Sequence, residues 1–485
     1  MLFNSIQFAL FLPIVFIIYW AIGYAKIKDL LQLRLQNAFV VIASYVFYGW
    51  WDWRFLILIA ITSFCSWGSG LLIVKNKEVR AKGKFWLIAN IVLNLGILAT
   101  FKYYDFFVSE FGALFEIDTS CLLLRVILPV GISFYTFQAL SYSIDVYRGN
   151  IEPTKDIIAF FAFISFFPQL VAGPIERATN LLPQFLQKRT FSYEQGVDGM
   201  RQILWGLFKK IVVADNCAIY VDQVWATYDS QSGSTLLLAA ILFTFQIYGD
   251  FSGYSDIAIG TAKLFGIELM RNFNNPYFSR DIAEFWRRWH ISLTTWFRDY
   301  VYIPLGGSRV GKWKIVRNTF VIFLLSGFWH GANWTFIAWG AYHAVLFLPL
   351  ILLGLNRKYT NQVADGRWLP TWKETGQILL TFMLAMFGWI IFRAETIAQA
   401  WEIMVNICSG STLTVPNLMT RGFYIPLFMS IIFMLLIEWL NRNYQHGLAR
   451  VTKWHSLNIV IYYALIVTIF QLSASGNVQF IYFQF

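Results

Sequence analysis

The sequence has few charged residues, only four cysteines and only five histidines among its 485 residues. Charged residues make up 13% of the chain, against about 25% in a typical soluble domain. This shortage excludes a protein that is mostly exposed to water. Apolar runs of about 20 residues, the length that crosses a bilayer as a helix, recur along the chain. We therefore expect an all-α, polytopic integral membrane protein with about a dozen transmembrane helices.

Other absences narrow the function. The four cysteines lie far apart without CxxC spacing, so we expect small core residues and no metal site. HExxH and GxSxG motifs are absent, which leaves a metalloprotease and an α/β-hydrolase unsupported. Lys and Arg number 38 against 27 Asp and Glu. We attribute this excess to cationic loops that meet the headgroups of membrane lipids, and we expect no nucleic-acid partner.

The basic loops predict the topology. Lysines and arginines gather at 26–34 and 75–84, and again at 312–317, 357–373 and 442–453. The positive-inside rule places these loops in the cytoplasm, so both termini are expected outside. The first apolar run, 8–23, has no basic region before it and no cleavage site after it, so we keep it as a span rather than a signal peptide.

The middle of the chain predicts irregular structure. Residues 170–185 contain Gly173, Pro174 and Pro183, and residues 248–260 contain Asp250 and Asp256 in an apolar context. Broken helices are tolerated at membrane depth only where protein or a water-filled cavity covers the exposed backbone. We therefore expect short re-entrant, tilted or interfacial helices around a central funnel or tunnel.

Two histidines, His290 and His330, stand among tryptophans in residues 281–309 and 326–340. Ionisable groups are costly at membrane depth and call for a functional explanation. Read as one helix, residues 281–300 place His290 on an aromatic face, which is typical of an interfacial helix. A packed structural histidine and a functional one are about equally compatible with this pattern.

His330 ends an apolar run between Gly327 and Gly331, which permit close approach of backbone or ligand. Burial favours the neutral imidazole that a general base needs. The amide of Asn333, or the backbone N–H groups after His330, are candidate donors to an oxyanion. A buried histidine that serves packing alone is the alternative reading.

Four blocks, at 172–184, 250–260, 272–307 and 328–340, resemble the membrane-bound O-acyltransferase (MBOAT) family. The resemblance is to the bacterial branch that acylates polysaccharides, which includes alginate O-acetylation and teichoic-acid D-alanylation proteins. It implies a single membrane domain over 1–485 in the bacterial cytoplasmic (inner) membrane, and an enzyme that moves an acyl group onto a hydroxyl. His330 occupies the position of the invariant histidine of the family, and His290 matches the second histidine of the branch. His343 matches no catalytic position.

The resemblance also implies a co-substrate, an acyl thioester for which acetyl-CoA is the expected donor, and no permanently bound cofactor. Arg287, Arg288 and Arg298 are candidates to hold the coenzyme A phosphates by charge-assisted hydrogen bonds. Anchoring of these arginines to lipid headgroups is equally compatible with the sequence.

The segment 473–485 ends in the aromatic sequence FIYFQF. In the related D-alanylation system, a small single-span protein ends in a similar motif whose tyrosine is thought to carry the acyl group. The resemblance implies that 457–485, the last span and tail, correspond to such a partner fused to this chain, with Tyr482 as a covalent acyl relay. An interfacial aromatic belt is the alternative.

Together these observations predict transfer of an acyl group, expected to be acetyl, from a cytoplasmic thioester toward hydroxyls of an extracytoplasmic polysaccharide. A secreted or periplasmic acyltransferase is the expected partner. Three alternatives stay open: a transporter or flippase, a non-catalytic scaffold of a polysaccharide export complex, and acylation of a lipid or protein. The acceptor is also open among alginate, other exopolysaccharides, cellulose, peptidoglycan and teichoic acid.

Overall fold

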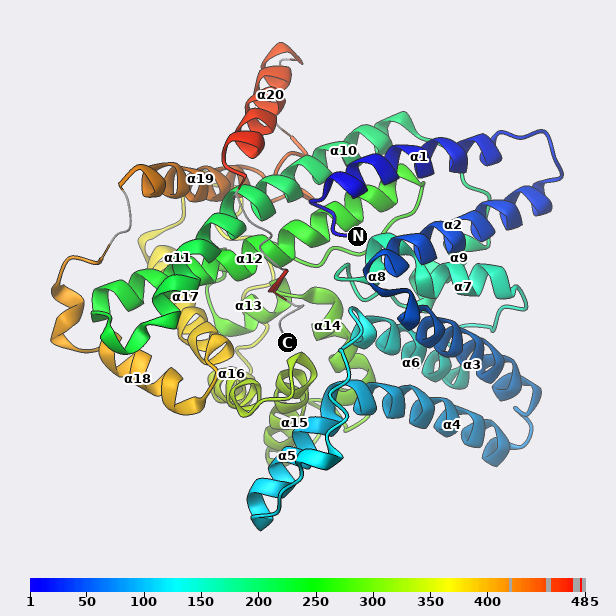
Figure 1. Ribbon diagram of the computed structural model, residues 1–485, viewed down its shortest axis with the longest axis horizontal. Helices are drawn as coiled ribbons and strands as arrows, with labels where there is room; N and C mark the ends of the chain where they lie inside the picture. The colour runs from blue at the N-terminus through cyan, green and yellow to red at the C-terminus, as the bar shows by residue number, and fades with distance from the viewer. Residues whose placement is uncertain (418–420, 451–454, 474–479, 482–485) are drawn as a thin grey trace. The chain divides into compact units, whose positions relative to one another are not determined.

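The computed structural model describes residues 1–417, 421–450, 455–473 and 480–481 (Figure 1). No residue in these ranges forms a β-strand, and most lie in helices. Six described stretches are helical, long and apolar enough to cross a membrane, and two shorter apolar helices cover Tyr424–Leu440 and Ser456–Gln471. The predicted all-α, polytopic fold is confirmed. The spans that can be counted are fewer than expected, in part because α2 and α3 merge into one stretch, Asp29–Lys75.

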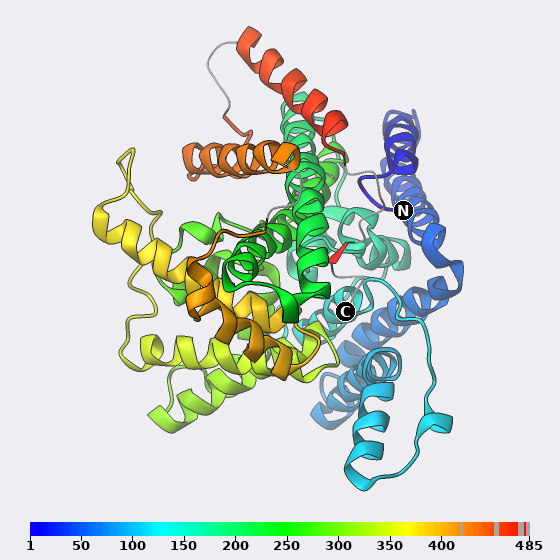
Figure 2. The same cartoon turned by 60° about the vertical axis from the view of Figure 1, so that its left-hand side comes forward.

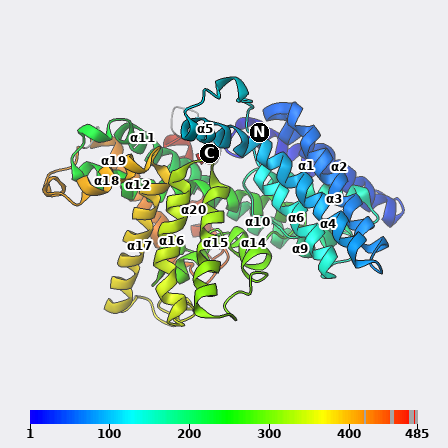
Figure 3. The same ribbon diagram turned by 90° about the horizontal axis from the view of Figure 1, so that it is seen from below.

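One compact unit comprises residues 1–200 and 258–270. Figure 3 shows its first four helices as a row, with α6 packed against α3 and α4. The side chains of α6 are buried along most of its length, so this helix forms much of the interior of the unit. The helices of the unit are α1 (Ile6–Gly23), α2 (Asp29–Asp52), α3 (Leu56–Lys75), α4 (Arg80–Leu98), the π-helix η2 (Ala99–Tyr103), α5 (Tyr104–Phe115), α6 (Ile132–Arg148), α7 (Ile157–Ser165), α8 (Phe167–Leu170) and α9 (Ala178–Phe185).

The second unit comprises residues 201–257 and 271–485. Two helices, α10 (Tyr193–Leu207) and α12 (Gly233–Leu264), contribute residues to both units. The other helices of this unit are the π-helix η4 (Phe208–Ala214), α11 (Asp215–Ala226), α13 (Ile282–Arg288), α14 (Ile291–Phe297), the π-helix η7 (Arg298–Tyr302), α15 (Lys312–His330), α16 (Trp334–Leu352), α17 (Trp372–Arg393), α18 (Ile397–Ile407), α19 (Arg421–Leu440) and α20 (His455–Gln471).

Glycines set how closely α15 and α16 approach, and Figure 2 shows these two yellow-green helices side by side. A side chain added at Gly327 would collide with the carbonyl oxygen of Phe336, and one at Gly340 would collide with that of Phe323. Overpacking of this kind costs about 1–3 kcal/mol. The two glycines therefore let the backbones touch, and this contact fixes the end of α15, where His330 lies.

The expectation of irregular structure in the middle of the chain is confirmed at one of its two segments. Between α8 and α9, residues 171–177 form no helix. Residues 248–260, in contrast, lie inside α12, which runs unbroken. The expected break there is wrong because Gly253 serves close packing: a side chain on it would lie 2.7 Å from the carbonyl oxygen of Gly206. The nearby carboxylates are tolerated inside the helix because Asp250 and Asp256 pair with lysines.

The single helix expected over 281–300 is also wrong. The helix is interrupted at His290, whose φ of 43° lies in the left-handed region. This interruption separates α13 from α14. A distant segment satisfies the backbone groups that the break exposes. The amide of Asn274 donates to the carbonyl of Arg288, and the amide of Ile291 donates to the carbonyl of Asn272, each at 2.9 Å. His290 therefore projects from a kink rather than from the face of a continuous helix.

Candidate active site

The first histidine of the site, His290, is held by the side chain of Asn272. The amide oxygen of Asn272 accepts hydrogen bonds from the backbone N–H of Ser292 at 3.3 Å and from its hydroxyl at 2.9 Å. Because the backbone N–H of Ser292 can only donate, the atom of the Asn272 side chain that it contacts must be the oxygen. His290 Nδ1 lies 3.2 Å from the same oxygen, so Nδ1 carries the proton and donates. The lone pair of the imidazole is thereby placed on Nε2.

Burial keeps His290 uncharged. The residue is 1% exposed, and burial lowers the pKa of its imidazole from about 6.5 to about 3. Its Nε2 is buried and has no hydrogen-bond partner among the residues that the structure describes. A buried polar atom without a partner is uncommon in folded proteins and is often found at functional sites. His290 is therefore a neutral imidazole with an unused basic nitrogen.

The second histidine, His330, is the last residue of α15 and is 5% exposed. Its ring centroid lies 6.5 Å from that of His290. Aromatic rings surround it: Trp329 at 5.0 Å, Trp339 at 5.2 Å and Phe392 at 5.3 Å between centroids. The structure thus brings together the two histidines that the sequence singled out, inside one aromatic cluster of the second unit.

A pocket of about 440 Å³ lies in the same unit; neither histidine lines it, but residues close to both in the sequence do. One wall is α14, where Ile291 and Thr294 line the pocket directly after His290. Another wall is α15, where lining residues reach Ser326, one helical turn before His330. Aromatic and aliphatic side chains such as Trp286 and Phe323 form much of the lining. Each of these two helices therefore contains, or directly follows, one of the two histidines.

Three arginines line this pocket: Arg287, Arg298 and Arg357. Arg287 donates to the backbone carbonyls of Asn356 and Tyr359, and Arg298 pairs with Asp299 at 2.6 Å. Sequence reasoning missed Arg357, because it lies in a basic loop that we assigned to the topology rather than to the site.

Arg288, the third candidate from the sequence, does not line the pocket. Its guanidinium pairs with Glu284 at 2.7 Å and donates to Gln362 at 2.6 Å. These bonds hold the loop after α16 against α13.

Two further residues have local structural partners. The side chain of Asn333 caps α16 by accepting from the amide of Thr335 at 3.0 Å, and its Nδ2 donates to the carbonyl of Glu395 at 3.0 Å. His343 Nδ1 accepts from the indole N–H of Trp286 at 3.3 Å. The amide of Asn333 is therefore engaged at the start of α16 in this structure.

Part of the aromatic tail reaches the same unit. Phe480 and Ile481 are both buried, and the amide of Ile481 donates to Asp250 Oδ2 at 2.7 Å. The ring of Phe480 lies 6.3 Å from that of Phe251, which in turn lies 4.6 Å from the ring of His290. Tyr482, the proposed relay, lies outside the described residues.

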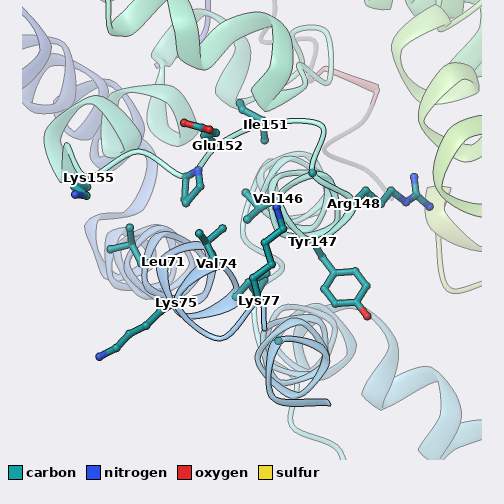
Figure 4. A pocket seen from close by; sticks show the side chains of 14 residues that line it. Leu71, Val74, Lys75, Lys77, Val146, Tyr147, Arg148, Ile151, Glu152 and Lys155 are labelled. Atoms are coloured by element: carbon teal, nitrogen blue, oxygen red, sulfur yellow. The ribbon is translucent and has the colours of Figure 1, made fainter. Parts of the chain in front are cut away.

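A larger hollow, of about 780 Å³, lies in the first unit between α3, α6 and the loop that follows α6. Figure 4 shows Lys77, Lys155 and Glu152 near an apolar part that includes Val74 and Val146. Its lining contains no histidine or cysteine. Two of its cations, Lys75 and Arg148, lie in the last turns of α3 and α6, where the helix dipole favours positive charge. This hollow lacks the histidines that carry the proposed chemistry in the second unit.

Comparison with known proteins finds a matching family model and several relatives. Residues 154–367 match the model of the membrane-bound O-acyltransferase family, and this range includes both histidines. The chain is 41% identical to the "Probable alginate O-acetylase AlgI" of Pseudomonas aeruginosa, over 85% of this chain and 76% of that protein. It is 35% identical to the "Peptidoglycan O-acetyltransferase" of Helicobacter pylori, over 83% of this chain and 79% of that protein. It is 30% identical to the "Teichoic acid D-alanyltransferase" of Bacillus subtilis, over 55% of this chain and 69% of that protein.

The protonation state of His290 gives a direct test of the geometry. In ¹⁵N-histidine solid-state NMR, we expect the His290 ring to carry its proton on Nδ1 and to stay neutral from pH 5 to 8, because the pKa is lowered to about 3. Replacement of Asn272 by Asp places a carboxylate beside Nδ1. The opposite charge favours the imidazolium, so the pKa of His290 should rise into the titrated range. Ser292→Ala is the control and should leave the ring neutral. A wild-type ring protonated on Nε2 would contradict the assignment.

Proposed function

The chain belongs to the membrane-bound O-acyltransferase family, and on this premise we propose that it carries an acetyl group from cytoplasmic acetyl-CoA toward hydroxyls of an extracytoplasmic polysaccharide. As a member of the family it is a multi-pass membrane enzyme of the acyltransferase class. The proposal rests above all on the paired, buried histidines beside an apolar pocket bordered by arginines. Relatives named for acetylation of alginate and of peptidoglycan support acetyl as the acyl group.

In the proposed reaction, His330 is the general base. The oxygen of an acceptor hydroxyl attacks the thioester carbonyl while the imidazole takes the hydroxyl proton. The tetrahedral intermediate then collapses: the C–S bond breaks, and the leaving thiolate recovers the proton as the free thiol of coenzyme A. His290 offers its unused Nε2 to the acceptor hydroxyl or to the imidazolium that forms at His330. This role follows from its tautomer and from its distance to His330.

Loss of the base should stop the chemistry. We expect His330→Ala to lower thioester consumption by about 10²–10⁴-fold, the usual contribution of general base catalysis. The measurement is release of free coenzyme A thiol from acetyl-CoA by the purified enzyme with its partner proteins and polymer. His343→Gln, in the same aromatic cluster, is the matched control and should retain activity. Unchanged thioester consumption in His330→Ala would contradict the enzymatic role and favour a flippase or a scaffold.

The pocket is proposed to hold the donor. The acetyl group and the pantetheine arm are uncharged and suit the apolar walls, whereas the phosphates of coenzyme A suit the arginines. Among these, Arg298 and Arg357 are better placed than Arg287, whose guanidinium is bonded to two backbone carbonyls. In this proposal the basic end of the pocket faces the cytoplasm and both chain termini lie outside.

Substitution of these arginines separates donor binding from lipid anchoring. We expect Arg298→Gln and Arg357→Gln each to raise the KM for acetyl-CoA by about tenfold, with a smaller change in kcat, because each removes a charge-assisted hydrogen bond to phosphate. Arg309→Gln is the control, because it removes the same charge from an exposed arginine that does not line the pocket. An unchanged KM together with weaker binding to anionic vesicles would contradict the donor site and support headgroup anchoring.

We further propose Tyr482 as an intermediate carrier, with residues 457–485 playing the part of a fused single-span partner. A phenol, with a pKa of about 10, loses its proton far more readily than a sugar hydroxyl, so it is the easier first acceptor for the acetyl group. The aryl ester would then deliver the acetyl group to a periplasmic acyltransferase, which completes transfer to the polysaccharide. Only the acetyl group crosses the membrane, so no charged nucleotide has to pass through lipid.

This relay predicts a covalent intermediate. We expect mass spectrometry of the enzyme after incubation with acetyl-CoA to find a hydroxylamine-labile acetyl group on the tail, and we expect Tyr482→Phe to abolish both this adduct and polymer acetylation. Phe483→Tyr in the Tyr482→Phe background tests whether the position of the phenol matters. Normal polymer acetylation by Tyr482→Phe would contradict the relay and leave in place a transfer from the thioester to another acceptor hydroxyl, with His330 as the base.

A further inference from the structure

We infer that Asp250, held by Lys210, is a positioning residue that docks the tail at Phe480 and Ile481 beside Phe251 and His290. This inference rests on the proposed function for its catalytic consequence, but the docking itself is a separate physical claim. It concerns a carboxylate in the middle of α12 that the proposed chemistry does not use. The contacts that carry it lie within the second unit.

The two oxygens of Asp250 have different partners. Lys210 Nζ lies 2.6 Å from Oδ1, and the backbone N–H of Ile481 donates to Oδ2 at 2.7 Å. The side chains of Asp250 and Lys210 are 4% and 2% exposed, so water does not compete strongly for either. A hydrogen bond from an amide to a buried carboxylate is stronger than one between neutral groups. If the tail were to leave, Oδ2 would lose its donor in a site largely closed to water, which favours the docked state.

The position of Lys210 explains how the carboxylate of Asp250 is paired and oriented. Lys210 lies on the π-helix η4 and also pairs with Asp215 at 2.7 Å. Helix α12 approaches this region closely: a side chain added at Gly253 would lie 3.1 Å from the backbone nitrogen of Lys210, and one at Gly249 would lie 2.9 Å from the carbonyl oxygen of Lys209. Lys210 thereby compensates the charge of Asp250 from one side and leaves its other oxygen for the tail.

Aromatic packing links the docked tail to the active site. The ring of Phe480 lies 4.6 Å from that of Tyr254, one turn along α12 from Asp250. Phe251, the residue next to Asp250, contacts both Phe480 and His290. Helix α12 therefore presents one carboxylate and two aromatic rings to the tail, and one of these rings also touches His290. Docking at Asp250 therefore holds Phe480 and Ile481 against a ring that contacts His290.

The experiment measures docking directly in the full-length enzyme. Cysteines placed at Phe480 and Tyr254, in a chain whose four native cysteines are replaced, would be joined by a short bismaleimide, and the cross-linked fraction would be followed over time without any donor present. Asp250→Leu removes the acceptor, and Asp250→Asn keeps a neutral acceptor. Asp215→Asn is the matched control, because it removes the other partner of Lys210 without touching the tail.

We expect Asp250→Leu to slow cross-linking by about tenfold or more, Asp250→Asn to have an intermediate effect, and Asp215→Asn to leave the rate within about twofold of the parent. On the chain with native cysteines, polymer acetylation should fall in the same order. Equal cross-linking in Asp250→Leu and the parent would overturn the docking. An equal reduction of the cross-linking rate in Asp215→Asn and Asp250→Asn would also overturn the docking, because it would show a general effect on stability.

The proposed relay and this inference fail separately. If Asp250→Leu undocks the tail while polymer acetylation stays normal, the positioning role is wrong, whatever Tyr482 does. If Tyr482→Phe acetylates polymer normally, the relay is wrong even where cross-linking shows a docked tail.

Discussion

The active site depends on how one broken helix satisfies its backbone groups. A chain kinked inside an apolar protein exposes N–H and C=O groups that cost free energy unless they are paired. Residues 272–274 supply those partners to the end of α13 and the start of α14. The same Asn272 that accepts from the backbone on one side of the kink also accepts from the ring of His290. The element that makes the kink tolerable therefore also fixes the tautomer of the histidine that projects from it.

Close approach of helices is the second requirement, and small residues provide it. At Gly327 and Gly340 the backbones of α15 and α16 touch, which fixes the end of α15 and with it His330. At Gly206 and Gly253 the chain of α10 and η4 lies against α12, which brings Lys210 to Asp250. In both places a contact between backbones decides where a nearby side chain lies. The glycines of the motifs thus act on the chemistry through helix packing.

The sequence predicted the helical membrane fold and the two histidines because composition and the rarity of ionisable groups are local signals. It could not predict the break at His290, since residues 281–300 contain neither proline nor glycine and the cause lies in Asn272, which is distant in the chain. The sequence wrongly predicted a break at 248–260 because glycine and aspartate are usually unfavourable in a buried helix. The partners of these residues on η4 are known only from the fold. Arg357 lines the pocket and Arg288 does not, and the sequence could not show this because it depends on how each arginine is paired in the fold.

The buried charges of this unit are paired with one another, whereas His290 lies among uncharged groups. Lys209 pairs with Asp256 at 2.6 Å and Lys210 with Asp215 and Asp250, so these buried charges are compensated within their own cluster. Around His290 and His330 the neighbours are instead aromatic rings and the neutral amide of Asn272. An uncompensated carboxylate beside either imidazole would favour the imidazolium, which cannot act as a base. In the proposed reaction, aromatic residues would also exclude water that competes with the acceptor hydroxyl for the thioester. The tryptophans of the two histidine motifs therefore have a chemical consequence in the proposed reaction: they help to bury His290, and burial keeps its imidazole neutral.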